Sequence, residues 1–322
     1  MLYQDVLVKT SEKYPDLTAV IFNDTSTSYM QLKQHVDVVA ENLWRFGVRP
    51  GDYLSTYLSN CLENLVFNLA IFKLGAVSVP IRAQLQAADI SHIVSEAQPK
   101  IIITSSMLAP ELKKALGAKI NDGSTQCFVM APEYLVPEWC LNFSALQAPH
   151  DEQVLPAVDV PSDAEVTVLY TSGSTGKPKG AVHTHEQWLF NAGLNAGNFN
   201  HGDITYVALS INHCHGLGEQ VLPALLNGAT LILSDGFKRD DFMRAVTSGL
   251  QINGVTFKAS SFYGVPSMFN SLAELSQEQL ATMPPHHLRL LDFAGDVLPP
   301  VIQNKIRALF GIALSVTYGM TE

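Results

Sequence analysis

The chain has 322 residues, of which 47% are hydrophobic and 16% are charged, and its formal net charge is -10 at pH 7. This apolar, weakly charged composition excludes a disordered chain, and the length fits one large domain or two smaller ones. The acidic balance, without a basic stripe, argues against a nucleic-acid-binding protein. No apolar run reaches the roughly 18 residues that a membrane span needs.

The N-terminal segment and the cysteines predict a cytoplasmic protein. The segment MLYQDVLVKT lacks the basic and apolar regions of a signal peptide. The four cysteines form no CxxC pair, and we interpret them as reduced thiols: Cys61, Cys127, Cys140 and Cys214.

The first part of the chain alternates between predicted helices and strands. Ser28 to Gln31 has the spacing of a capping box, and apolar residues then recur at steps of four and three from Leu32 to Phe46. This pattern indicates an amphipathic helix, which Gly47 ends. Strands are predicted at residues 53–58, 77–80 and 100–104, with an apolar helix at residues 64–74.

Residues 131–162 contain several prolines and little periodicity, so a long surface connection is predicted there. After this segment, strands are predicted with helical segments between most of them, at residues 165–170, 206–209, 230–233, 254–257, 290–293 and 314–317. The alternation predicts layered α/β subdomains with mostly parallel sheets. We expect a first subdomain at roughly residues 1–185 and a second at residues 186–322.

The strongest motif, TSGSTGKPKG, spans residues 171–180 and follows a predicted strand. Its three glycines allow a tight turn close to an anion, and its four hydroxyls and two lysines suit a polyanion such as triphosphate. It is not a Walker A loop, because only two residues separate Gly173 from Gly176 and Pro178 stands where Ser or Thr would hold magnesium. A flexible surface loop is the competing interpretation.

Residues 170–180 (YTSGSTGKPKG), followed by His183 and His185, resemble the phosphate loop of the adenylate-forming superfamily. That superfamily includes acyl- and aryl-CoA synthetases, luciferases and peptide-synthetase adenylation domains. Further blocks resemble the family in the right order, at residues 27–29, 73–76, 79–80, 210–216, 222–229, 255–272, 294–300 and 318–322. The resemblance implies an incomplete N-terminal AMP-binding domain of an acyl-CoA synthetase-like fold, without the smaller C-terminal domain and its catalytic lysine.

The resemblance also implies two half-reactions. A carboxylic acid attacks the α-phosphorus of ATP, which gives an acyl-adenylate and pyrophosphate, and the thiol of CoA or pantetheine then displaces AMP. The implied cofactors are ATP, Mg²⁺ and CoA. Because a carboxylate and a triphosphate are both negative, magnesium, lysines and oriented donors must neutralise their charge.

Individual roles follow from the same resemblance. The β- and γ-phosphates would be held by Thr171, Ser172, Gly173, Ser174, Thr175, Gly176 and Lys179. The final segment resembles the family's Y-G-x-T-E, with Thr321 donating to the α-phosphate and Glu322 holding magnesium. His213 would orient the substrate carboxylate or close the acyl pocket, with a satisfied core histidine as the alternative. Nucleotide contacts, chiefly with adenine, are implied for Gly295, Asp296, Val297, Tyr318 and Gly319.

The acyl site is less well defined. Phe262, Tyr263 and Met268 are candidates for its wall, with ordinary core packing as the alternative, and Asn212 departs from the aromatic residue that CoA ligases often carry. Two other functions remain open: a nucleotide-binding fragment without full activity, and an amino-acid adenylation domain of a peptide synthetase. His213 disfavours the second, because amino-acid-activating relatives tend to carry Asp at that position.

Overall fold

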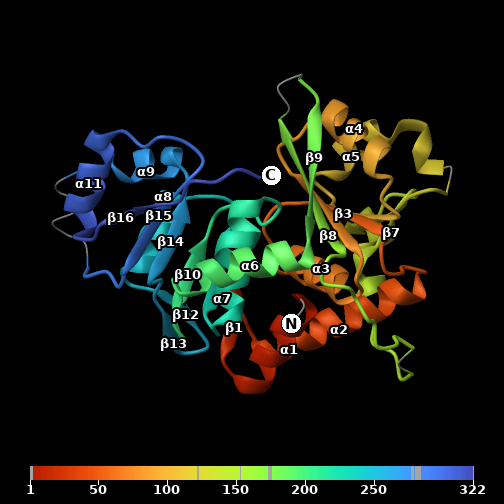
Figure 1. Cartoon of the computed structure of the whole chain (residues 1–322), viewed down its shortest axis with the longest axis horizontal. Helices are drawn as coiled ribbons and strands as arrows, with labels where there is room; N and C mark the ends of the chain where they lie inside the picture. The colour runs from red at the N-terminus through yellow and green to blue at the C-terminus, as the bar shows by residue number, and fades with distance from the viewer. Residues whose placement is uncertain are drawn as a thin grey trace. The chain divides into compact units, whose positions relative to one another are not determined.

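The computed structural model of the chain describes residues 3–121, 123–152, 154–172, 176–276, 279 and 284–321 (Figure 1). The chain forms two compact units. The first contains residues 31–191, the segment before Thr10, and Thr321; the second contains residues 10–30 and 192–320. Within the described residues, each unit is built on its own seven-stranded sheet.

The sheet of the first unit has the strand order β7-β6-β5-β3-β4-β8-β9. Neighbouring strands are parallel, except for the antiparallel pair β8 and β9. The strands are β3 (Tyr53–Leu58), β4 (Val77–Arg82), β5 (Ile101–Ser105), β6 (Gln126–Met130), β7 (Leu141–Asn142), β8 (Glu165–Ser172) and β9 (Pro178–Thr184).

Helices cover both faces of this sheet (Figure 1). The chain moves one way along the sheet from β3 to β4 and the other way from β4 to β5 and β6. Right-handed crossovers therefore place α3 on one face and α4 and α5 on the other. The helices are α2 (Tyr29–Arg45), α3 (Leu62–Lys73), α4 (Ala87–Ala97) and α5 (Ala109–Leu116), with short turns η1 (Gly117–Asn121), η2 (Glu133–Leu135) and η3 (Phe143–Leu146).

The prediction of a surface connection at residues 131–162 is only partly correct. β7 pairs with β6, and Phe143 and Leu146 are buried. Asn42 in α2 donates from Nδ2 to the carbonyl oxygens of Leu146 (3.1 Å) and Ala148 (2.9 Å). A buried amide that satisfies distant carbonyls leaves no periodic sequence pattern, so the segment's attachment was not predicted.

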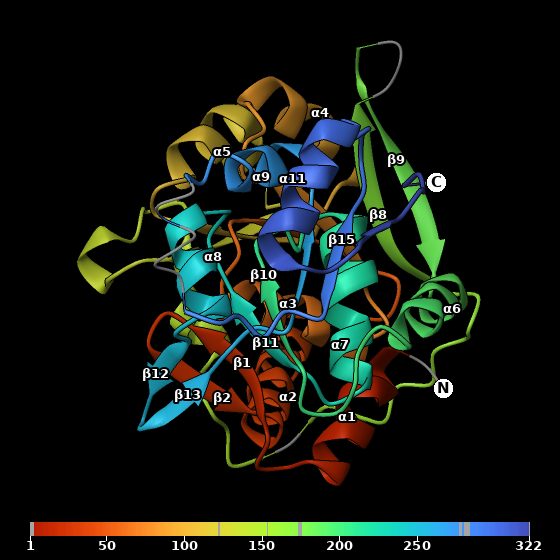
Figure 2. The ribbon, with the colours of Figure 1, turned by 90° about the vertical axis from the view of Figure 1, so that its left-hand side faces the viewer.

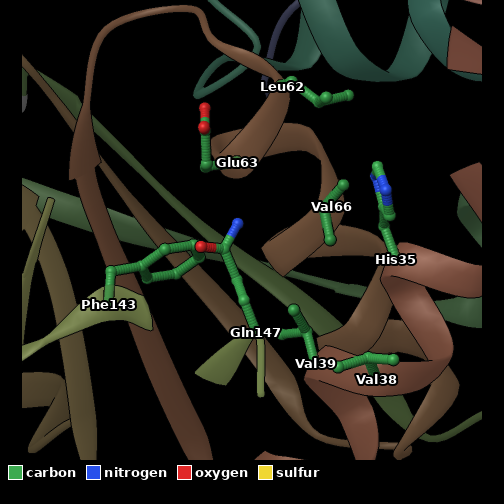
Figure 3. Close-up of a pocket in the computed structure, with 8 residues that line it drawn as sticks. All are labelled: His35, Val38, Val39, Leu62, Glu63, Val66, Phe143 and Gln147. Atoms are coloured by element: carbon green, nitrogen blue, oxygen red, sulfur yellow. The ribbon is translucent and has the colours of Figure 1, made fainter. Parts of the chain in front are cut away.

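A cavity of about 200 Å³ lies where α2, α3 and the η3 segment meet (Figure 3). Its lining is mostly apolar, and it contains no residue predicted to bind nucleotide or substrate: His35, Val38, Val39, Leu62, Glu63, Val66, Phe143 and Gln147. The cavity therefore belongs to the packing of the connection against the helices.

The second unit has the strand order β16-β15-β14-β10-β11-β1-β2, parallel except for β2. A separate antiparallel hairpin joins β12 and β13. The strands are β1 (Thr18–Phe22), β2 (Thr25–Ser28), β10 (Ile204–Val207), β11 (Thr230–Leu233), β12 (Leu250–Ile252), β13 (Val255–Phe257), β14 (Ser261–Gly264), β15 (Leu290–Phe293) and β16 (Leu314–Val316).

Residues 10–30 differ from the expected division, because they belong to the second unit and not to the first. β1 pairs in parallel with β11, and the Thr230 hydroxyl donates to the Thr18 carbonyl at 2.6 Å. The Tyr29 hydroxyl donates to the Ala229 carbonyl, also at 2.6 Å. These partners are about 200 residues apart in the chain, so local periodicity could not assign the segment. The other division falls at residues 191 and 192, close to the expected 185 and 186.

The two faces of the second sheet differ in character. The direction of the crossovers places the π-helix η4 (His215–Val221) and α7 (Leu222–Leu226) on one face. The other face carries α8 (Arg239–Val246), α9 (Pro266–Leu272) and α11 (Pro300–Phe310), which lie toward the viewer in Figure 2. This second face holds an aromatic core that includes Phe242, Phe262, Phe269, Phe293 and Phe310.

The sequence candidates for the acyl wall do not all lie on the same face of this sheet. Phe262 is fully buried in the aromatic core, 4.7 Å from Phe242 between ring centroids, and Met268 packs against the same core. Two further helices are α1 (Tyr3–Lys13), which precedes β1, and α6 (His185–Ala196), which follows β9. In the described part of the chain, no helix is both long enough and apolar enough to cross a bilayer.

Candidate functional site

The described residues of the predicted phosphate loop lie on the hairpin formed by β8 and β9 (Figure 1). Thr171 is the cross-strand partner of Lys179, so their side chains lie on the same face of the hairpin. Lys177 and Lys179 are exposed, and Gly176 has φ of +86°, which other residues rarely adopt. The hairpin thus presents cations and a hydroxyl beside a turn that only glycine accepts readily. Gly173, Ser174, Thr175 and the side chain of Ser172 lie outside the described residues.

Helix α4 holds this hairpin in place. His92 Nε2 lies 2.9 Å from the Pro178 carbonyl oxygen. Burial and a hydrogen bond to Glu96 raise the pKa of the Tyr170 hydroxyl, which therefore stays protonated. Sequence reasoning did not identify these supports, because His92 and Glu96 look like ordinary exposed positions on a helix.

Thr321 lies beside the same hairpin. Its carbonyl oxygen is 2.5 Å from His183 Nε2 on β9, and both ribbon views show the end of the chain next to β9 (Figures 1 and 2). The first unit thus brings Thr321 to the strand that carries Lys179. Glu322, the predicted magnesium ligand, lies outside the described residues. Among those described, no group of three or more His, Cys, Asp or Glu is arranged to hold a metal ion.

His213 lies in a tight turn between β10 and η4 in the second unit. Its backbone N–H donates to the Ser210 carbonyl (3.2 Å), and its ring Nδ1 accepts from the backbone N–H of His215 (3.3 Å), which orients the ring. A Cβ on Gly216 would lie 2.1 Å from the Ser210 oxygen, so only glycine fits there. Asn212 is buried in the same turn.

The predicted adenine loop follows β15. Gly295 has φ of +92°, and the side chain of Asp296 accepts from the next backbone N–H, that of Val297, at 2.7 Å. The backbone N–H of Thr317 donates to the carbonyl oxygen of Phe293, the last residue of β15 (3.0 Å). This bond places the exposed Tyr318 beside the loop. Both segments lie at the carboxyl ends of parallel strands, where open α/β sheets bind their ligands.

The second unit also holds a group of titratable side chains, three of them buried and Glu219 partly buried, that we call the polar cluster: His215, Glu219, Tyr263 and Asp292. Tyr263 and Asp292 are register partners on β14 and β15, and each is 1% exposed. They alternate with Phe262 and Phe293 of the aromatic core, so they face the side of the sheet that carries η4. Only Tyr263 was a sequence candidate. Asp292 could have been found, because it interrupts the apolar strand LLDF.

Burial governs the charges of the polar cluster. It lowers the pKa of His215 to about 4, so this imidazole is neutral, and it raises the pKa of Glu219 and Asp292. The charge of Asp292 adds to the rise at Glu219. His215 Nε2 is 3.7 Å from Glu219 Oε2, beyond hydrogen-bond distance. The cluster therefore contains two carboxyl groups that are costly to ionise without a nearby cation.

The predicted residues thus fall into one group in each unit. The first unit holds Thr171, Gly176, Lys179 and Thr321, and the second holds His213, Gly295, Asp296, Val297, Tyr318 and Gly319. Within the second unit, all of them lie on segments that follow parallel strands at their carboxyl ends.

Comparison with known proteins identifies a family and relatives. The model of the AMP-binding enzyme family matches residues 7–322. The chain is 25% identical over 316 residues to the crotonobetaine/carnitine–CoA ligase of Salmonella typhi, which covers 96% of this chain and 59% of that protein. The chain therefore spans about 59% of the length of this curated relative.

Solved structures share the fold over the whole chain. The N-terminal domain of FACL13 from Mycobacterium tuberculosis has a TM-score of 0.84 at 23% identity, and the chain covers 76% of it. The anthranilate CoA ligase AuaEII, solved in complex with anthranoyl-AMP, has a TM-score of 0.88 at 22% identity, with 60% of that chain covered. The predicted fold class, an α/β N-terminal domain of the acyl-CoA synthetase type with mostly parallel sheets, is confirmed.

Proposed function

Because the chain belongs to the AMP-binding enzyme family, we propose that it activates a carboxylic acid with ATP and that the acyl group then passes to the thiol of CoA or pantetheine. In the first step, a carboxylate oxygen bonds to the α-phosphorus of ATP, and the bond from that phosphorus to pyrophosphate breaks. In the second, the thiol sulfur bonds to the acyl carbon, AMP leaves, and the thiol proton passes to solvent.

The observation that carries this proposal is the β8–β9 hairpin, with Thr171 and Lys179 paired across it and Thr321 beside it. The Lys179 ammonium would offset the charge of the β- and γ-phosphates, and the Thr171 hydroxyl would donate to them. Gly176 would let the backbone approach the phosphates closely. Thr321 would donate to the α-phosphate at the point of attack.

The second unit would supply the acid and adenine contacts. The His213 ring, oriented by the His215 N–H, would face the substrate carboxylate and hold it for attack. Gly295, Asp296 and Val297 would contact the adenine edge, and the 93%-exposed Tyr318 offers a ring on which adenine could stack.

Magnesium, when bound, would neutralise phosphate charge and polarise the phosphorus centre. Glu322 is the residue that we propose to hold it, because a carboxylate suits a hard cation.

The names of the relatives support both half-reactions. The Salmonella relative is a CoA ligase, and the AuaEII structure contains anthranoyl-AMP, the kind of mixed anhydride expected after the first step. Since the chain spans about 59% of that relative's length, the complete reaction is proposed for the longest product of the gene.

Acid-dependent ATP–pyrophosphate exchange tests the first half-reaction directly. It should be measured on the 322-residue chain and on the longest gene product, across fatty, aryl and amino acids, with CoA thioester formation followed separately. We expect one acid class to stimulate exchange, and more strongly in the longer product. ATP binding without exchange for any acid in either protein would contradict the proposal and favour a nucleotide-binding fragment.

A further inference from the structure

The polar cluster stands out because its polar atoms are buried and incompletely paired. His215 Nε2, the Tyr263 hydroxyl and Asp292 Oδ1 are buried without a hydrogen-bond partner among the described residues. The side chains of Asn198 and Ser315 lie close enough to Tyr263 and Asp292 to oppose the rise in their pKa values, but neither meets hydrogen-bond geometry with these atoms. Leaving such atoms unpaired is costly, and native proteins avoid it unless a ligand completes the set. Three of these atoms in one cluster therefore point to a ligand.

The geometry places these groups on one surface. Tyr263 and Asp292 lie side by side in register on the adjacent parallel strands β14 and β15, and Ser315 continues the same row on β16. η4 adds His215 and Glu219 one helical turn apart, and the His215 and Tyr263 rings meet edge to face with centroids 6.3 Å apart. The row is open at one end, because Ser315 is exposed on the edge strand.

The carboxyl groups of the cluster have no cationic side chain paired with them among the described residues. Asp292 Oδ2 accepts from the Thr317 hydroxyl (3.2 Å), but its Oδ1 remains unpaired. Arg289, the cation nearest in sequence, pairs with Asp203 instead. Within the part of the chain that the structure describes, no lysine or arginine forms an ion pair with Glu219 or Asp292. A buried carboxyl group, Asp292, and a partly buried one, Glu219, without a cation fit a ligand that brings one.

The cluster is also continuous in sequence with the proposed activation site. His213 is two residues before His215 in the same turn, and the adenine loop begins three residues after Asp292. An acid held by its carboxylate at His213 would therefore extend its other end along the surface that carries the cluster.

We propose that the polar cluster selects a carboxylic acid bearing a cationic amino group remote from its carboxylate, with Asp292 and Glu219 as the counter-charges. The unpaired Asp292 Oδ1 accepts an N–H of the ammonium group, and the ammonium charge keeps both carboxyl groups ionised. This inference rests on the proposed function, since it names the class of acid that the same site activates.

Calorimetry with matched acids tests the proposal without requiring turnover. The 322-residue chain is titrated with 4-aminobutyrate against pentanoate and with 5-aminopentanoate against hexanoate, pairs in which a methyl group replaces the ammonium group. We expect the amino acid of at least one pair to bind roughly tenfold to a hundredfold more tightly than its neutral partner, as for a charged hydrogen bond. 2-Aminobutyrate, with its ammonium group beside the carboxylate, should bind no better than pentanoate.

Variants that remove one carboxylate charge test whether Asp292 and Glu219 cause the preference for the amino acid. Asp292→Asn and Glu219→Gln keep the side-chain shapes and should each reduce the preference for the amino acid at least about tenfold. Asp240→Asn removes a carboxylate whose side chain is 96% exposed and should leave the preference unchanged. Circular dichroism confirms folding of each variant, and the ratio of the two affinities separates selection from a general structural loss.

Each outcome has a defined meaning. Equal or tighter binding of the neutral acids, a preference for 2-aminobutyrate, an unchanged ratio in Asp292→Asn, or binding of neither member of any pair would overturn the proposal. ATP binding is measured on the same samples. If the chain binds ATP and a neutral acid drives exchange, the substrate class is wrong and acid activation stands. If the amino-acid preference holds but no exchange occurs, acid activation fails and the selection remains.

Discussion

The position of Lys179 in the hairpin makes it a better candidate for phosphate binding than Lys177. Lys177 and Lys179 are both exposed on the β8–β9 hairpin, but only Lys179 faces a hydroxyl residue, Thr171, in the register of the sheet. A strand holds its side chain on one face, whereas a side chain in the turn has more freedom. Lys179 is therefore the better candidate for a fixed phosphate contact.

Lys179→Ala should weaken ATP binding about tenfold, because it removes a charge-assisted contact to the phosphates. Calorimetric titration of the 322-residue chain with ATP measures this directly. Lys113→Ala, which removes an exposed lysine from α5, is the matched control and should bind like the wild type. Unchanged affinity in Lys179→Ala would show that the hairpin is not the phosphate site.

Gly216→Ala should destabilise the second unit by about 2 kcal/mol or more, because the new methyl would collide with the Ser210 oxygen in the turn that orients His213. Gly193→Ala, in α6 with no atom within 4 Å of the added methyl, should raise stability by up to about 1 kcal/mol through its better helix propensity. Urea unfolding midpoints compare the two, and equal shifts would refute the steric account.

Among the elements, α2 acts as the attachment point for a long irregular segment. Asn42 is 3% exposed and donates to Val38 within the helix as well as to Leu146 and Ala148 beyond it. Its Oδ1 lies 2.7 Å from His150 Nε2. One amide thus supplies partners that would otherwise have to come from a strand or from water.

Asn42→Ala should cost about 1–3 kcal/mol of stability, because it leaves buried carbonyl oxygens without donors. Hydrogen exchange should show faster opening of residues 143–150 than in the wild type. Gln34→Ala, on the exposed side of α2, should change stability by less than about 0.5 kcal/mol. Unchanged exchange in Asn42→Ala would mean that packing of Phe143 and Leu146 alone holds the segment.

For the whole molecule, each unit contains one buried histidine that resists protonation. Burial lowers the pKa of His185 in the first unit and of His215 in the second to about 4, from an ordinary value of 6.5. The unfolded chain binds these protons more readily, so the stability that depends on the neutral rings is present above pH 6.5. It is lost as the pH falls toward 4, by about 3 kcal/mol for each ring. Glu219 and Asp292, whose pKa values are raised, act in the opposite direction.

The free energy of unfolding should therefore fall between pH 6.5 and pH 4, and His185→Gln should flatten this dependence. Urea titrations across this range, with the exposed His35→Gln as the control, measure the slope. A steep dependence that persists unchanged in His185→Gln would assign the acid sensitivity to other groups, such as the hydrogen-bonded carboxylate of Glu41, whose pKa is lowered.

Most elements were predictable because their signals are local. The amphipathic period of α2, the β-branched run of β5 and the strand before the glycine-rich motif each need only adjacent residues, and the observed bounds agree within a few residues. β1, β2, β6, β9 and β14 were missed, and β13 was predicted without its antiparallel partner β12. β1 and β14 pair with strands that lie far away in the chain, whereas β2, β9 and β12 each belong to a hairpin with a neighbouring strand. In both cases the pairing, rather than a periodic pattern of the strand itself, defines the element.

The sequence by itself determined the family, the α/β class, and the order of the segments proposed to bind phosphate, carboxylate and adenine, since motifs and periodicity are properties of neighbouring residues. Only the tertiary structure decided that residues 10–30 join the second unit, that the connection after β6 packs on α2, and that Asp292 meets Tyr263. Those results depend on register and on hydrogen bonds between residues far apart in the chain, where burial also sets the charge of each side chain.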